Sequence, residues 1–75
     1  MKKITKQELA EALGCAIGRE VGMQGLNVLI HGWLRFRRYG TQYRHAIHAR
    51  DWLYMTEVME LSEYAGCDLT KKSAQ

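Results

Sequence analysis

The sequence predicts an all-α protein, a small three-helix bundle with a long C-terminal helix. Three observations indicate this fold class. Proline is absent from all 75 residues, and proline costs roughly 3 kcal/mol inside a helix. Good helix formers such as Ala, Leu, Glu and Arg outnumber the β-branched residues. Apolar residues recur at spacings of three and four, which places them on one face of a helix.

The length predicts a single domain over residues 1–75. A chain this short buries little core, so a homodimer or a bound partner would add stability. A deep pocket is difficult to form in so small a core. We therefore expect a binding protein that is not an enzyme and has no small-molecule substrate and no cofactor.

The first predicted helix covers about residues 5–21. Thr5 and Glu8 have the spacing of a capping box, in which each side chain bonds the other residue's backbone N–H. Gly14, Gly18 and Gly22 recur every four residues. This row has two interpretations: it allows another helix to approach closely, or it divides the helix into short pieces.

The second predicted helix covers about residues 26–39, and Gly40 is expected to end it. The third covers about 42–65, and Gly66 is expected to end it in the same way. Residues 69–75 are expected to form a frayed tail. The core residues that these helices predict are Leu9, Leu13, Ile17, Leu26, Leu29, Ile30, Trp33, Ile47, Tyr54, Val58 and Leu61.

No window of the sequence has the length and apolarity of a membrane span, and the first residues are polar. We therefore expect a cytoplasmic protein without a membrane partner. Cys15 and Cys67 belong to no C-x-x-C motif, and their spacing does not establish whether they pair. His45 and His48 have the spacing of two metal ligands on one helix face, but no third ligand is evident, so no metal site is predicted.

Positive charge is concentrated in the middle of the chain, where residues 33–52 contain five arginines and one acid, Asp51. Guanidinium groups bind phosphates or carboxylates, and aromatic rings offer stacking faces. The turn at Gly40 should gather several of these side chains. The predicted site for nucleic acid or another anionic partner consists of Arg35, Arg38, Tyr39, Tyr43 and Arg44. The predicted function is regulation by binding nucleic acid or a nucleic-acid-handling complex.

A second apolar row is predicted on the far side of the third helix. It contains Trp52, Met55 and Met59, with His48 beside it. An exposed Trp–Met row is typical of protein interfaces. The alternative function is therefore a protein-binding inhibitor of a host complex, encoded by a phage or mobile element, such as an anti-CRISPR or other anti-defence protein.

Residues 7–14 resemble the first helix and turn of DNA-binding helix-turn-helix proteins, with Ala10 and Gly14 at the small positions. The resemblance ends there, because Glu20 stands where an apolar residue is expected and Gly18 and Gly22 interrupt the second helix. No Ser-His-Asp, Cys-His or paired-carboxylate arrangement is apparent. Glycine-rich phosphate loops are also absent.

Overall fold

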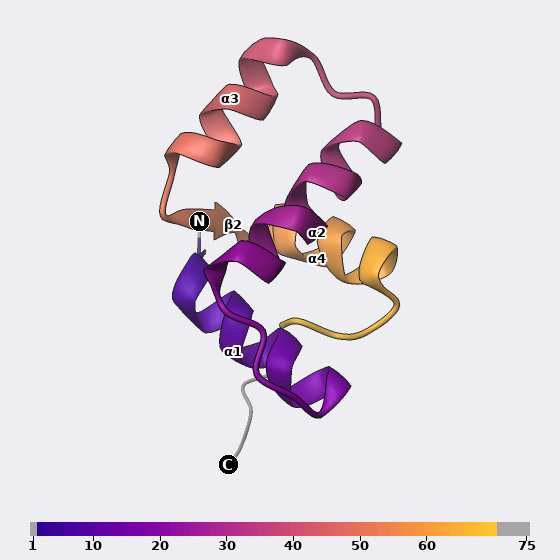
Figure 1. The fold of residues 1–75 in the computed structure, drawn as a ribbon. Coiled ribbons are helices and arrows are strands. Elements are labelled where there is room, and N and C mark those ends of the chain that lie inside the picture. Colours follow the sequence, from indigo (N-terminus) through magenta and orange to yellow (C-terminus); the bar gives the residue numbers. More distant parts are fainter. Residues whose placement is uncertain (1, 71–75) are drawn as a thin grey trace.

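The computed structural model describes residues 2–70. It contains four helices and a two-stranded antiparallel sheet, shown in Figure 1. In chain order these are β1 (Lys3–Thr5), α1 (Lys6–Ile17), α2 (Met23–Phe36), α3 (Thr41–Ala49), β2 (Trp52–Tyr54) and α4 (Met55–Ala65). The helical class was correctly predicted, but the three-helix bundle was not.

The predicted long helix over residues 42–65 is wrong. The helix ends at Ala49, and Trp52–Tyr54 pair with β1 in the register Ile4 with Leu53. The apolar spacing of Ile47 and Val58 suits one continuous helix. Residues 52–54, which lie between them, instead pair with a strand that is remote in sequence.

The two strand–helix units, β1–α1 and β2–α4, are related by an approximate twofold repeat. Adding 49 to the numbers of Lys2, Ile4 and Lys6 gives Asp51, Leu53 and Met55. The backbone bonds that frame the sheet follow this relation: Lys6 N–H donates to Asp51 O at 2.7 Å, and Met55 N–H to Lys2 O at 3.0 Å. The two ends of the sheet are therefore framed by equivalent backbone hydrogen bonds.

Both units begin with the same local device. The backbone N–H of Thr5 donates to Glu8 Oε1 at 3.1 Å, and that of Tyr54 donates to Glu57 Oε1 at 2.8 Å. The Thr5 capping box is confirmed, because its hydroxyl also accepts from the Glu8 N–H. Both units also end on a left-handed glycine, since Gly18 and Gly66 each have φ of 77°.

The glycine row of the first predicted helix therefore divides the chain into pieces. Gly18 ends α1, and Gly22 precedes α2 with φ of 37°. The helix consequently stops at Ile17, which is 46% exposed and does not join the core as predicted.

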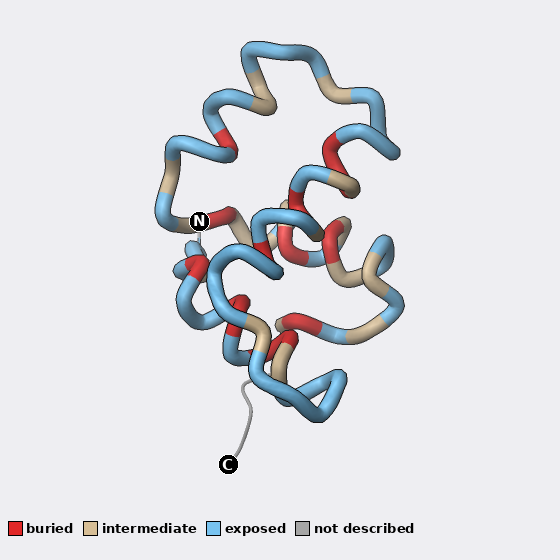
Figure 2. Tube along the Cα trace, in the orientation of Figure 1, coloured by how far each residue is buried: buried red, intermediate tan, exposed pale blue. Residues whose placement is uncertain are grey.

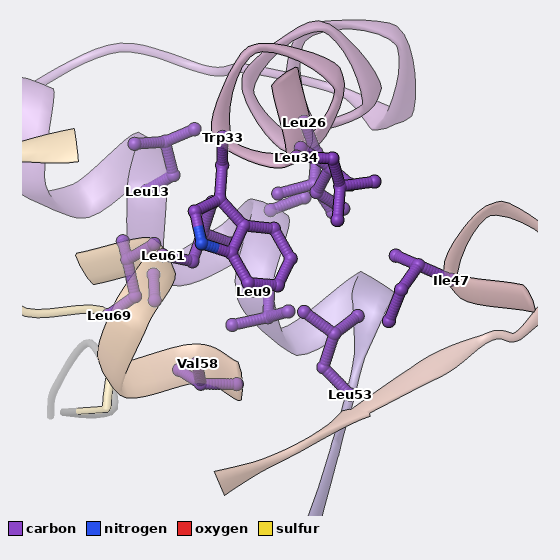
Figure 3. Packing of buried hydrophobic residues seen from close by; sticks show 13 residues of the cluster. Leu9, Leu13, Leu26, Trp33, Leu34, Ile47, Leu53, Val58, Leu61 and Leu69 are labelled. Carbon is purple, nitrogen blue, oxygen red and sulfur yellow. The ribbon is translucent and has the colours of Figure 1, made fainter. Parts of the chain in front are cut away.

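The core lies where α1, α2, α4 and the inner face of β2 meet (Figure 3). Trp33 is fully buried, and aliphatic side chains of α1, α2 and α4 lie around its ring. The large buried residues are Leu9, Leu26, Ile30, Trp33, Leu34, Ile47, Leu53, Val58, Leu61 and Leu69. Leu69 belongs to the region predicted to be a frayed tail, and its burial corrects that prediction for this residue. Residues 71–75 of that tail lie outside the described residues.

The second half of α2, the turn after it and α3 form an arch on one side of the molecule (Figure 1). Most of this arch is exposed, as the pale blue tube in Figure 2 shows, and Ile47 is the buried residue of α3. We call residues 23–50, from the start of α2 to the residue that follows α3, the arm.

Candidate nucleic-acid interface

The arm carries positive charge without any acidic residue of its own. Residues 21–50 contain five arginines and three histidines, and no Asp or Glu. The acidic residues come before and after this segment, chiefly on α1 and α4. Any carboxylate that neutralises an arm arginine must therefore come from another element.

Two of the five arm arginines have such a carboxylate. Arg50 Nη2 lies 2.7 Å from Glu57 Oε1, and Arg37 Nη2 lies 3.6 Å from Glu60 Oε2. Both glutamates belong to α4. These two arginines therefore connect the arm to the rest of the molecule and are not available in full to a ligand.

The other three are Arg35, Arg38 and Arg44, which are the arginines that the sequence predicted for the site. None of them forms an ion pair with any residue between 2 and 70. Arg35 and Arg38 are exposed, and Arg44 donates from Nη2 to Thr41 Oγ1 at 3.2 Å. Three guanidinium groups near one turn thus lack a counter-charge.

The turn holds Arg38 in a backbone conformation that normally favours glycine. Its φ is 59°, in the left-handed region. The N–H groups of Arg38 and Tyr39 donate to the carbonyls of Arg35 and Leu34, at 3.0 and 3.2 Å, which is a Schellman motif with arginine at the left-handed position. The predicted role of Gly40 in ending this helix is wrong, since Gly40 instead precedes the first turn of α3.

Histidines face one another across the arm. The rings of His31 on α2 and His48 on α3 have centroids 6.1 Å apart. Residues four apart share a helix face, so Arg35 lies on the His31 row and Arg44 on the His48 row, each nearer the turn. One side of the arm therefore presents two rows of basic groups.

The charge environment of His48 reflects this crowding. Partial burial lowers its pKa from the ordinary value, and the nearby basic groups lower it further. Those groups, in decreasing order of effect, are Lys6, His31, His45 and Arg44. An anion beside His48 would relieve this repulsion.

Lys6 of α1 fixes the end of α3. Its side chain is buried, and its Nζ donates to the carbonyls of Ile47 and His48, at 2.9 and 3.3 Å. A cation at a helix C-terminus satisfies unpaired carbonyls and suits the helix dipole. Burial lowers the pKa of Lys6, and Asp51 acts in the opposite direction. No local sequence pattern indicates this contact, because Lys6 and the end of α3 are more than 40 positions apart.

Tyr39 and Tyr43 both form contacts within the molecule, and their predicted part in binding stays a prediction. The Tyr39 hydroxyl donates to Glu60 Oε1 at 2.5 Å, and the Tyr43 hydroxyl donates to Glu57 Oε2. Their rings pack edge-on with centroids 4.7 Å apart, and Tyr39 also packs edge-on against Trp33. Both tyrosines are half-buried against α4 and anchor the arm.

The predicted row of Trp52, Met55 and Met59 does not lie on a single helix. Trp52 is in β2, Met55 is the first residue of α4, and Met59 is 55% exposed in the middle of that helix. His48, placed beside this row by the sequence, instead faces His31 on the arm. The four residues therefore come from three different elements, and the predicted single helix face is wrong.

The described residues do not suggest a metal centre or a membrane span. No group of three or more His, Cys, Asp or Glu side chains between 2 and 70 could hold a metal ion. Cys15 and Cys67 are both free thiols. No helix in that range is long and apolar enough to cross a membrane.

Comparison with known proteins gives no family for this chain. Models of protein families, curated proteins and solved structures all yield no match.

Proposed function

We propose that this chain is a non-enzymatic protein that binds nucleic acid, with the arm against the phosphate backbone. One observation carries the proposal: an arm without acidic residues presents three arginines that have no ion-pair partner among the described residues. Arginine binds phosphate through paired N–H donors and stays charged at every physiological pH. The basic side of the arm is therefore suited to a polyanion.

The arrangement favours contacts with phosphates over contacts with bases on the arm. The arm tyrosines are half-buried and pack edge-on against neighbouring rings, so they are less open to bases than the exposed arginines are to phosphates. Phosphate contacts position a ligand but carry no sequence information. We therefore expect the arm to bind with little sequence preference and with a strong dependence on salt.

The test is the salt dependence of binding to a short labelled DNA duplex, followed by fluorescence anisotropy. For each arginine replaced by alanine at Arg35, Arg38 or Arg44, the slope of log Kd against log salt should fall by about one. Arg19→Ala is the matched control, because Arg19 is an exposed arginine outside the arm. Absence of binding to DNA and RNA at low salt would overturn the proposal, as would equal losses from Arg19→Ala.

A protein-binding inhibitor is the second candidate. It is favoured by the exposure of large apolar side chains: Val28 is 73% exposed, Phe36 70% and Met59 55%. Such side chains act as anchors in protein interfaces. Capture of one defined partner from a lysate that has been treated with nuclease, and its loss in Phe36→Ser, would favour this candidate over the first.

A further inference from the structure

The outer face of the β1–β2 ribbon carries aromatic rings and a free cation. Successive side chains of a strand point to opposite faces. Leu53 is fully buried and Ile4 packs against the core, so these two define the inner face. Lys3, Trp52 and Tyr54 therefore belong to the outer face, where both rings are half-exposed.

Two cations lie over these rings. The Trp52 and Tyr54 centroids are 4.8 Å apart, and Lys3 Nζ is 4.1 Å from the Trp52 centroid. Arg50 Cζ is 4.2 Å from the same centroid. Arg50 is held by Glu57, whereas Lys3 is exposed and forms no ion pair with residues 2–70. Lys3 thus lies over the Trp52 ring without an ion pair to hold it there, and its side chain is long enough to move aside.

This face continues into the arm. A hollow of about 340 Å³ is lined by Thr5 and Lys6, by Asn27, His48 and Arg50 of the arm, and by Asp51. Thr5 pairs with Trp52 in the ribbon, and His48 belongs to the basic side of the arm. A strand of phosphates on the arm therefore has a short path to Trp52.

From this juxtaposition we infer that the ribbon is a stacking platform for an unpaired base, and that the chain prefers single-stranded to duplex nucleic acid. The inference rests on the proposed function, since the arm supplies the phosphate contacts. A base stacks on the Trp52 ring in place of the Lys3 ammonium, which moves to a flanking phosphate. Bases inside a duplex are stacked on their neighbours and cannot reach the ring.

The experiment compares labelled oligo(dT) with a duplex of equal length, for the wild type, Trp52→Leu and Trp52→Phe. Loss of one stacked base weakens binding about tenfold or more. We expect Trp52→Leu to show this loss for oligo(dT) and an unchanged Kd for the duplex, with Trp52→Phe between. Equal losses on both ligands, or no loss on oligo(dT), would overturn the inference.

Fluorescence of the unmodified protein gives a second measurement that does not depend on a variant folding. Trp33 is fully buried, so quenching by an added ligand reports on Trp52. We expect oligo(dT) to quench emission and the duplex to leave it nearly unchanged. Similar quenching by poly-glutamate at equal charge would indicate a general anion site and overturn the inference. If the wild type binds neither nucleic acid, the proposed function itself fails. If oligo(dT) binds without any change in Trp52 emission, the proposed function stands and the stacking platform alone is overturned.

Discussion

Arg50 and Glu57 form a half-buried ion pair that closes the base of the arm. Arg50 follows α3, Glu57 lies in the first turn of α4, and Nη2 is 2.7 Å from Oε1. The same carboxylate also accepts from the Tyr54 N–H and the Tyr43 hydroxyl. One glutamate at the start of α4 therefore connects α3, the residue that follows α3 and the end of β2.

Glu57→Gln should lower the free energy of unfolding by about 2 kcal/mol, because the amide loses the charge and one of the acceptor oxygens. Denaturant unfolding measures this loss. Glu60→Gln is the matched control: Glu60 also accepts from a tyrosine, but its ion pair is longer, at 3.6 Å, and its side chain is 33% exposed against 12% for Glu57. We expect the control to lose about 1 kcal/mol or less. Equal losses would contradict the central role of Glu57.

Stability should fall at alkaline pH, through the tyrosines of the arm. Burial and the bond to Glu57 raise the pKa of Tyr43 above its ordinary value of 10.0, and the bond to Glu60 raises the pKa of Tyr39. Above that pH the unfolded chain loses the phenolic protons while the folded chain keeps them. The stabilisation is therefore complete below about pH 10 and is lost as the pH rises further.

Tyr43→Phe isolates this contribution. The variant should be less stable near neutral pH by about 1 kcal/mol, because a hydrogen bond is missing, but its stability should fall less steeply above about pH 10. Lys6, whose lowered pKa has the opposite effect on the pH dependence, is common to both proteins and cancels in the comparison. Unfolding curves at several alkaline pH values provide the measurement, and parallel profiles would show that Tyr43 does not contribute.

Arg38→Gly should stabilise the fold and weaken ligand binding at the same time. Glycine adopts a φ of 59° without the steric cost that arginine bears, so the midpoint of thermal unfolding should rise, by an amount equivalent to about 1 kcal/mol. The same change removes one of the three free guanidinium groups. Arg38→Lys keeps both the charge and the strain, and it should resemble the wild type in stability. A less stable Arg38→Gly protein would show that the arginine side chain supports the turn.

Binding should strengthen as the pH falls through the range where His48 titrates. In the free protein the pKa of His48 is lowered by burial and by Lys6, His31, His45 and Arg44. A phosphate beside His48 raises that pKa again, so binding takes up a proton and is favoured as the pH falls through the ordinary histidine value of 6.5 and below it. Arg50 and Asp51 also line the hollow beside His48.

Replacing both His31 and His48 by asparagine should remove most of this pH dependence. The duplex affinity measured at each pH is the readout, and the salt slope near neutral pH serves as the control because the arginines are unchanged. If the double variant has the same pH profile as the wild type, groups other than these histidines take up the protons.

The features that the sequence predicted correctly are those with a local cause. The Thr5–Glu8 capping box and the glycine stop at Gly66 depend on residues a few positions apart, and both are present. The strand at Trp52–Tyr54 depends on Ile4 and its neighbours, which no local pattern connects to it. The three arginines of the candidate site were predicted from the sequence. That they lack an ion-pair partner could not be predicted, because it depends on the glutamates of α4 pairing with Arg37 and Arg50 instead.

The pairing of Ile4 with Leu53 also governs how this chain must fold. The ends of a span of 49 positions have to meet before the ribbon exists and before Trp33 is enclosed. We therefore expect the closing of this long loop, more than helix formation, to limit the rate of folding. The entropy of closure grows only slowly, by about 0.6 kcal/mol for each doubling of length. The arm lies inside this loop. The mostly exposed turn between α2 and α3, residues 37–40, can therefore change in length at small energetic cost, whereas the buried residues of the arm, such as Trp33 and Ile47, are fixed by the core.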